Sequence, residues 1–179
     1  MGVRTIASVT ILIFGTIFCL STWPGASAQP GREIPMKTTH ARARAEARTI
    51  VHSSEAKPYD QTASPALMEL HLSETFTGDG MDRESSFSGE STVRALQVVR
   101  DDKSVSMVSV QRFRGKLGGR QGTFVLQGSE TIEKGKIKAK WFVVPRSGTG
   151  ELSGLRGEGG FEGEFGKGGS TATLEYWFE

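Results

Sequence analysis

Polar and apolar residues alternate along most of the chain beyond residue 40. Three segments show the pattern most clearly, through the apolar sets Met68, Leu70, Leu72 and Phe76; Ile137, Ala139, Trp141 and Val143; and Ala172, Leu174, Tyr176 and Phe178. A repeat of two places successive side chains on opposite faces of a strand, whereas a helix repeats every 3.6 residues. These segments are therefore predicted to be strands with one buried face, and Lys138 is expected on an exposed face.

Turn-forming residues separate the alternating segments. They are Gly78-Asp79-Gly80, Asp101-Asp102-Lys103, Gly118-Gly119, Lys134-Gly135 and Gly166-Lys167-Gly168-Gly169. The intervening segments predict eight strands at about 42–54, 66–77, 86–99, 104–115, 120–132, 136–145, 150–162 and 170–179. Eight strands with short turns favour an all-β fold, an eight-stranded antiparallel closed barrel over residues 41–179, because closure leaves no strand edge exposed. A sandwich of two sheets is the competing architecture.

The first 28 residues have the three parts of a signal peptide. Arg4 gives a positive start, residues 6–20 form an uncharged apolar core, and Ala26-Ser27-Ala28 offers the small residues that a signal peptidase reads. The apolar core is shorter than the roughly 20 residues of a membrane-spanning helix. We therefore expect an exported protein, periplasmic or extracellular, with no stable membrane insertion after cleavage. An uncleaved anchor is the alternative, and residues 29–40 are expected to be a flexible lead-in.

The mature protein is expected to begin at Gln29 and to contain no thiol. Cleavage after Ala28 leaves 151 residues and removes Cys19, the only cysteine of the chain. N-terminal sequencing and thiol titration of the exported protein test this. An intact leader on the purified protein would indicate an anchored form instead.

Composition excludes several classes of function. The chain has 22 Lys and Arg against 20 Asp and Glu, without the basic excess of a nucleic-acid-binding protein. The histidines His40, His52 and His71 lack metal-ligand spacing, so no metal is expected. The glycine-rich segments fit neither the dinucleotide nor the P-loop pattern, and no serine lies in a nucleophile elbow. No cofactor is expected.

Several motifs resemble one family of bacterial proteins. They are Lys57-Pro58-Tyr59-Asp60, Thr75-Phe76-Thr77-Gly78-Asp79, the segment 118–127 (GGRQGTFVLQ), the segment 141–152 (WFVVPRSGTGEL) and Leu155-Arg156-Gly157-Glu158-Gly159. The set is similar to the family named domain of unknown function 3224, over about residues 45–179. The resemblance implies a small eight-stranded barrel of the allene oxide cyclase-like type. Where that family tends to have Glu-Arg, this chain has Gln111-Arg112, so a catalytic role for that glutamate could not be kept here.

Six residues are candidates for the barrel interior and for ligand binding: Glu74, Gln111, Arg112, Gln127, Trp141 and Tyr176. Glu74 shares a face with apolar residues, where a carboxylate must be paired, protonated or turned outward at a bulge. Arg112 and Tyr176 are its expected partners, with Gln111 as a neutral alternative. Gln127 could line the interior, although Phe124 and Leu126 place the core on the other face of its strand. Trp141 is expected to pack in the core.

Three hypotheses for function follow. The first is an exported barrel that binds a small apolar or amphipathic molecule. The second is a cofactor-free cyclase or isomerase, which depends on analogy of fold alone. The third is a structural barrel with a filled interior that acts through its surface or as a homo-oligomer. An interior cavity would favour the first two, and convergence of Glu74 with Tyr176 would favour the second.

Overall fold

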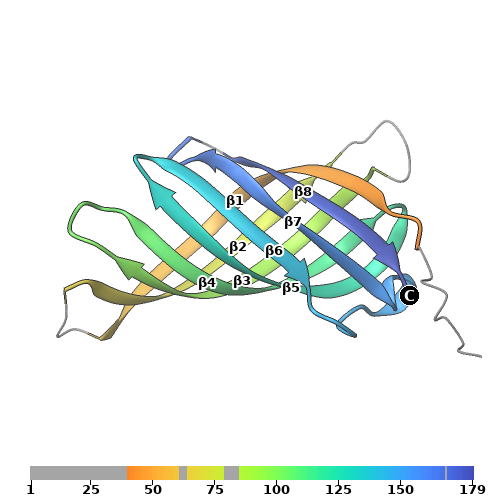
Figure 1. The fold of residues 1–179 in the computed structure, drawn as a ribbon, viewed down its shortest axis with the longest axis horizontal. Coiled ribbons are helices and arrows are strands. Elements are labelled where there is room, and N and C mark those ends of the chain that lie inside the picture. The colour runs from red at the N-terminus through yellow and green to blue at the C-terminus, as the bar shows by residue number, and fades with distance from the viewer. Residues whose placement is uncertain (1–39, 61–63, 79–84, 168) are drawn as a thin grey trace, which may run out of the picture. The chain divides into compact units, whose positions relative to one another are not determined.

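Eight antiparallel strands follow one another around a closed barrel, and the last strand pairs with the first (Figure 1). The computed structural model describes residues 40–60, 64–78, 85–167 and 169–179. The strands are β1 (Ala43–Asp60), β2 (Ala66–Thr77), β3 (Phe87–Val99), β4 (Val105–Leu117), β5 (Arg120–Glu133), β6 (Lys136–Val143), β7 (Leu155–Glu164) and β8 (Ser170–Phe178). A short 3-10 helix, η1 (Gly150–Leu152), precedes β7. The predicted fold is confirmed, and pairing of β1 with β8 rules out the sandwich.

Two predicted strand ends are wrong. β1 continues to Asp60 rather than ending near residue 54, because β2 pairs with it along this whole length. β7 begins at Leu155 rather than at residue 150, because Gly150 and Gly154 adopt positive φ angles that interrupt an extended chain. The segment before β7 folds back on β5, where Ser147 Oγ accepts a hydrogen bond from the Val125 amide at 3.0 Å.

One end of the barrel is sealed by apolar side chains. Phe87, Leu117, Leu152 and Leu155 are fully or almost fully buried there, and Leu152 reaches this core from η1. Gly118 and Gly119 make the β4–β5 turn with positive φ angles at both residues. This short turn lies at the same end, where the buried apolar side chains fill the interior.

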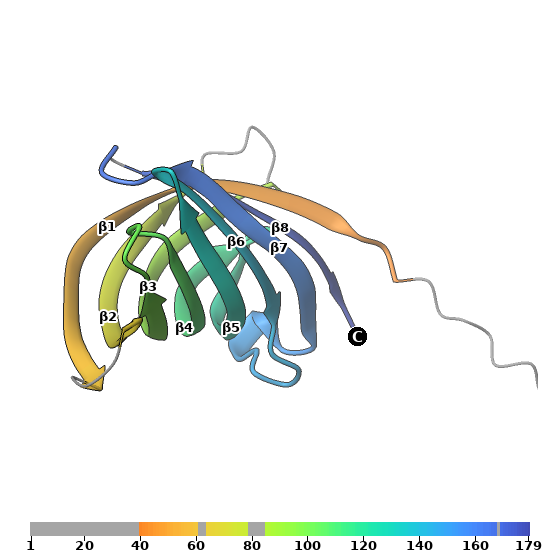
Figure 2. The ribbon, with the colours of Figure 1, turned by 60° about the vertical axis from the view of Figure 1, so that its left-hand side comes forward.

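The opposite end is more open. Pairing of β1 with β8 ends at Thr49, whereas pairing of β1 with β2 continues to Asp60, so the β1–β2 hairpin extends beyond the closed part of the barrel. Figure 2 shows β1 curving along the edge of the neighbouring strands toward this end. Inward-facing Met68, Leu72 and Met107 are only half-buried, and Val51, paired with inward Glu74, is 51% exposed. The barrel is therefore a cup with one sealed and one open end.

The predicted leader, residues 1–28, lies outside the described residues, as does nearly all of the predicted lead-in, residues 29–40. In the part of the chain that the structure describes, no helix has the length and apolar character needed to cross a membrane.

Candidate functional site

A hydrogen-bonded polar group lies inside the barrel on three neighbouring strands. Glu74 of β2 is directly opposite Ser91 of β3, and Gln111 of β4 lies diagonally across from Ser91. The Ser91 hydroxyl donates to Glu74 Oε1 at 3.0 Å, and Gln111 Nε2 donates to Ser91 Oγ at 2.7 Å and also to Glu74 Oε1. The carboxyl group is thus held by two neutral donors in the interior.

The Glu74 carboxyl group is about half protonated at neutral pH, as its raised pKa indicates. Burial raises the pKa of Glu74 to about 7, and the nearby charge of Glu130 adds to that increase. The hydrogen bonds from Ser91 and Gln111 oppose it, because they favour the ionised form. A carboxyl group of this kind can donate or accept a proton near pH 7.

Glu130 of β5 is a second inward carboxyl group. Its neighbour on the same face is Ser109 of β4, whose hydroxyl donates to Glu130 Oε1 at 3.0 Å. Burial raises the pKa of Glu130 too, while the bond from Ser109 lowers it. Two acids that share a poorly solvated interior repel each other when both are ionised.

Trp141 of β6 faces the same interior, at a position diagonally across from Glu130 of β5. Its partners on the neighbouring strands are Gly128 and Gly159, and a Cβ at Gly128 would be only 3.1 Å from the Trp141 Cβ. The ring contacts Phe161 and Phe76, with centroid distances of 5.3 and 6.3 Å. Trp141 Nε1 is buried and has no hydrogen-bond partner among the described residues. A buried N–H group without a hydrogen-bond partner is stabilised when a ligand places an acceptor atom next to it.

The structure brings together three of the six sequence candidates. Glu74, Gln111 and Trp141 face the interior at the middle of the barrel. Tyr176 is also buried, but it lies at the sealed end, where a Cβ on Gly118 would be 2.1 Å from its hydroxyl oxygen. Glu74 and Tyr176 therefore do not converge, and the arrangement expected to favour an enzyme is absent.

Arg112 and Gln127 do not face the interior. Both are exposed on the outer surface, and the expectation that they line the barrel is wrong. Gln111 and Phe113 point inward, so the pleat of β4 turns Arg112 outward; inward Leu126 does the same to Gln127 on β5. Arg112 consequently does not pair with Glu74, whose donors are Ser91 and Gln111.

Sequence reasoning missed Ser91, Ser109 and Glu130, the other polar residues of this hydrogen-bonded interior group. Each keeps the alternation of its strand: Ser91 with Val93, Ser109 with Gln111, and Glu130 with Leu126. Counting by twos from those neighbours would have placed them inside. They were overlooked because polar residues in alternating segments usually lie on the exposed face.

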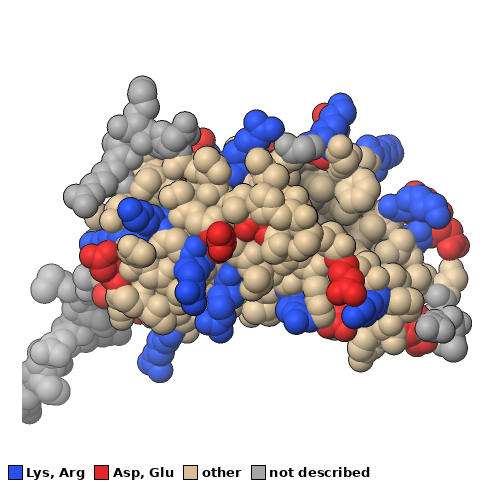
Figure 3. Space-filling view, turned by 180° about the vertical axis from the view of Figure 1, so that it is seen from behind, with Lys and Arg blue, Asp and Glu red and all other residues tan. Residues whose placement is uncertain are grey.

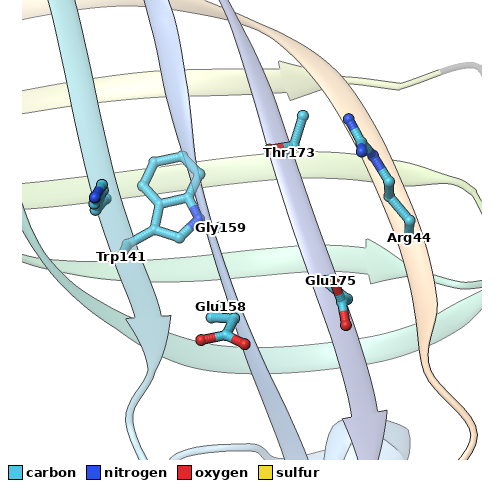
Figure 4. Close-up of a pocket in the computed structure, with 7 residues that line it drawn as sticks. Arg44, Trp141, Glu158, Gly159, Thr173 and Glu175 are labelled. Atoms are coloured by element: carbon cyan, nitrogen blue, oxygen red, sulfur yellow. The ribbon is translucent and has the colours of Figure 1, made fainter.

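Two hollows of about 420 Å³ border this interior group, one at Trp141 and the other at Glu130. The first is bordered by the exposed side chains of Arg44, Glu158 and Glu175 on neighbouring strands (Figure 4). The second is lined by residues on both faces of β2–β5, with Met107 and Glu130 from the inward face and Leu96 and Val108 from the outward face. Lysines, arginines and acids are interspersed on the face seen in Figure 3. Over the described ranges, no group of three or more His, Cys, Asp or Glu could hold a metal ion.

Comparison with known proteins identifies the family. Residues 45–176 match the family described as "Protein of unknown function (DUF3224)". The barrel is also similar to the crystal structure of a protein with unknown function from the DUF3224 family of Shewanella oneidensis MR-1. That similarity has a TM-score of 0.59 and 26% sequence identity, and covers 78% of this chain and 98% of the other. No curated protein matches the chain. With the eight-stranded barrel and the family match in agreement, the chain belongs to the DUF3224 family.

Proposed function

We propose that the barrel binds a small amphipathic molecule that enters through the open end. The observation that carries this proposal is Trp141 Nε1, a buried donor without a partner among the described residues, in the same interior as two half-buried carboxyl groups. A ligand that places a polar oxygen beside Trp141 would satisfy this donor. Its apolar part would lie against the half-buried side chains of Met68, Leu72 and Met107 near the open end.

The proposed place of action is outside the cytoplasm. The leader-like residues 1–28 support export to the periplasm or the extracellular medium. Mature protein recovered from that compartment is the material in which a natural ligand would be retained, and native mass spectrometry would detect it as added mass.

Binding of the neutral fluorescent probe N-phenyl-1-naphthylamine tests the proposal. We expect saturable binding to the mature protein, and about tenfold weaker binding to Met107→Arg, because the new charge lies on the inward face at the open end. Val110→Arg is the matched control, since Val110 of the same strand faces outward, is exposed and does not line the hollow that contains Met107. Loss of binding in both variants, or no saturable binding together with no retained ligand, would contradict the proposal and favour a structural barrel.

A cofactor-free isomerase or cyclase is the second candidate. It is favoured by the pKa of Glu74, which burial raises to about 7 and which suits a general acid or base. Incubation of a retained ligand with fresh protein distinguishes the candidates. A binding protein returns the ligand unchanged on chromatography, whereas an isomerase converts it and its Glu74→Gln variant does not.

A further inference from the structure

The middle of the barrel's inward face carries two acids without balancing cations. Along the described strands, Glu74 and Glu130 are the inward positions with a carboxyl group, and the one cation at an inward register position, Arg120, is exposed at the sealed end, where its guanidinium lies 4.0 Å from the centre of the Phe178 ring. The Tyr176 phenol also lies at the sealed end, away from the two acids. All hydrogen bonds to the two carboxyl groups come from the neutral residues Ser91, Gln111 and Ser109. Ionisation of these acids therefore leaves uncompensated negative charge in the interior.

The surroundings of the two acids suit an organic cation. The rings of Trp141 and Phe161 lie in the same interior, and aromatic faces attract ammonium groups. Trp141 is 6% exposed, and its unpartnered Nε1 can donate a hydrogen bond to an acceptor atom on the same ligand. The half-buried methionines Met68 and Met107 lie toward the open end and can accommodate an aliphatic chain.

We propose that the ligand is an amphipathic amine, whose ammonium group lies between Glu74 and Glu130 and whose alkyl chain extends toward the open end. This inference rests on the proposed binding function and specifies its ligand class. An oxygen next to the amine, as in an amino alcohol, would in addition accept the hydrogen bond from Trp141 Nε1. Each ammonium N–H would face carboxylate or hydroxyl oxygens, which are the acceptors that charge-assisted hydrogen bonds prefer.

The inference predicts a pH dependence of binding. Burial raises the pKa of Glu74 to about 7, so this carboxyl group is largely protonated at pH 5.5 and ionised at pH 8.5. An alkyl ammonium keeps its charge over that range, because amines of this type ionise near pH 10.4. The groups facing Glu74 are Ser91 and Gln111, with Glu130 the nearby charge, and none of them supplies an opposing trend in this range. Affinity for the amine should therefore increase with pH.

Three ligands of equal chain length separate charge from apolar contact. Decylamine, decanol and decanoate are titrated calorimetrically into the mature protein at pH 8.5, below their micelle-forming concentrations. We expect decylamine to bind about tenfold more tightly than decanol, and decanoate to bind most weakly. Glu74→Gln should abolish the preference for the amine, whereas Glu90→Gln should keep it. Glu90 is the matched control, because it is exposed and the change removes the same charge from the outer face.

The outcomes distinguish this inference from the function on which it rests. Equal binding of decylamine and decanol would overturn the amine assignment and leave the apolar binding site intact. Failure of all three ligands and of N-phenyl-1-naphthylamine would reject the binding function itself. If Glu74→Gln does not fold, as judged by circular dichroism, the wild-type protein gives the decisive result. A preference for the amine that is the same at pH 5.5 and pH 8.5 would then overturn the inference.

Discussion

Replacement of Trp141 by alanine is expected to lower the free energy of unfolding by about 3–5 kcal/mol. The side chain is 6% exposed and packs against Phe76 and Phe161. Its strand neighbours Gly128 and Gly159 have no side chains that could move into the space left by the indole. The cavity should therefore persist, and its full cost should appear in the stability of the barrel.

Urea denaturation followed by far-UV circular dichroism measures this effect. Lys138→Ala on the same strand is the control, with an expected change below about 0.5 kcal/mol. Lys138 is exposed, and its ion pair with Glu162 (3.2 Å) lies at the surface, where such pairs contribute little. Similar losses in the two variants would show that the inward and outward faces of β6 are misassigned.

The wild-type protein is expected to lose about 3 kcal/mol of unfolding free energy as the pH increases and Glu74 ionises. Glu74→Gln should remove this loss. Burial raises the pKa of Glu74 from 4.5 to about 7 in the folded protein. Between these values the folded state binds more protons than the unfolded state, so stability falls as pH increases through this window. The penalty is absent below about pH 4.5 and complete above about pH 7. The glutamine variant has no group to ionise at this position.

The measurement is the difference in unfolding free energy between wild type and variant from pH 4 to pH 8.5. At pH 4 the variant should be less stable by about 1 kcal/mol, because its amide N–H groups replace a carboxyl group held by Ser91 and Gln111. At pH 8 it should be the more stable protein. Glu90→Gln, which removes an exposed carboxylate, should show no such crossing. A difference that stays constant across the range would mean that Glu74 is not buried as a titrating group.

The partners of Glu74 were predicted only in part, because the alternative partner Gln111 binds it and the two preferred partners do not. The carboxyl group was expected to be paired, protonated or turned outward at a bulge, with Arg112 and Tyr176 as its partners and Gln111 as a neutral alternative. The structure satisfies the carboxyl group with the neutral donors Ser91 and Gln111 instead. Since burial raises its pKa to about 7, the group is largely protonated below neutral pH and needs no permanent cation.

The sequence by itself determined the strands, most of their ends and the inward side of each clear alternation. It placed Glu74, Gln111 and Trp141 inside and Lys138 outside, because the period of two is a local property of an extended chain. Only the tertiary structure decided that β1 closes on β8, that η1 helps to seal one end, and that Glu130 joins Glu74 in one interior. Those features depend on pairings between residues far apart in the chain, and alternation within one strand carries no information about which distant strand it will meet.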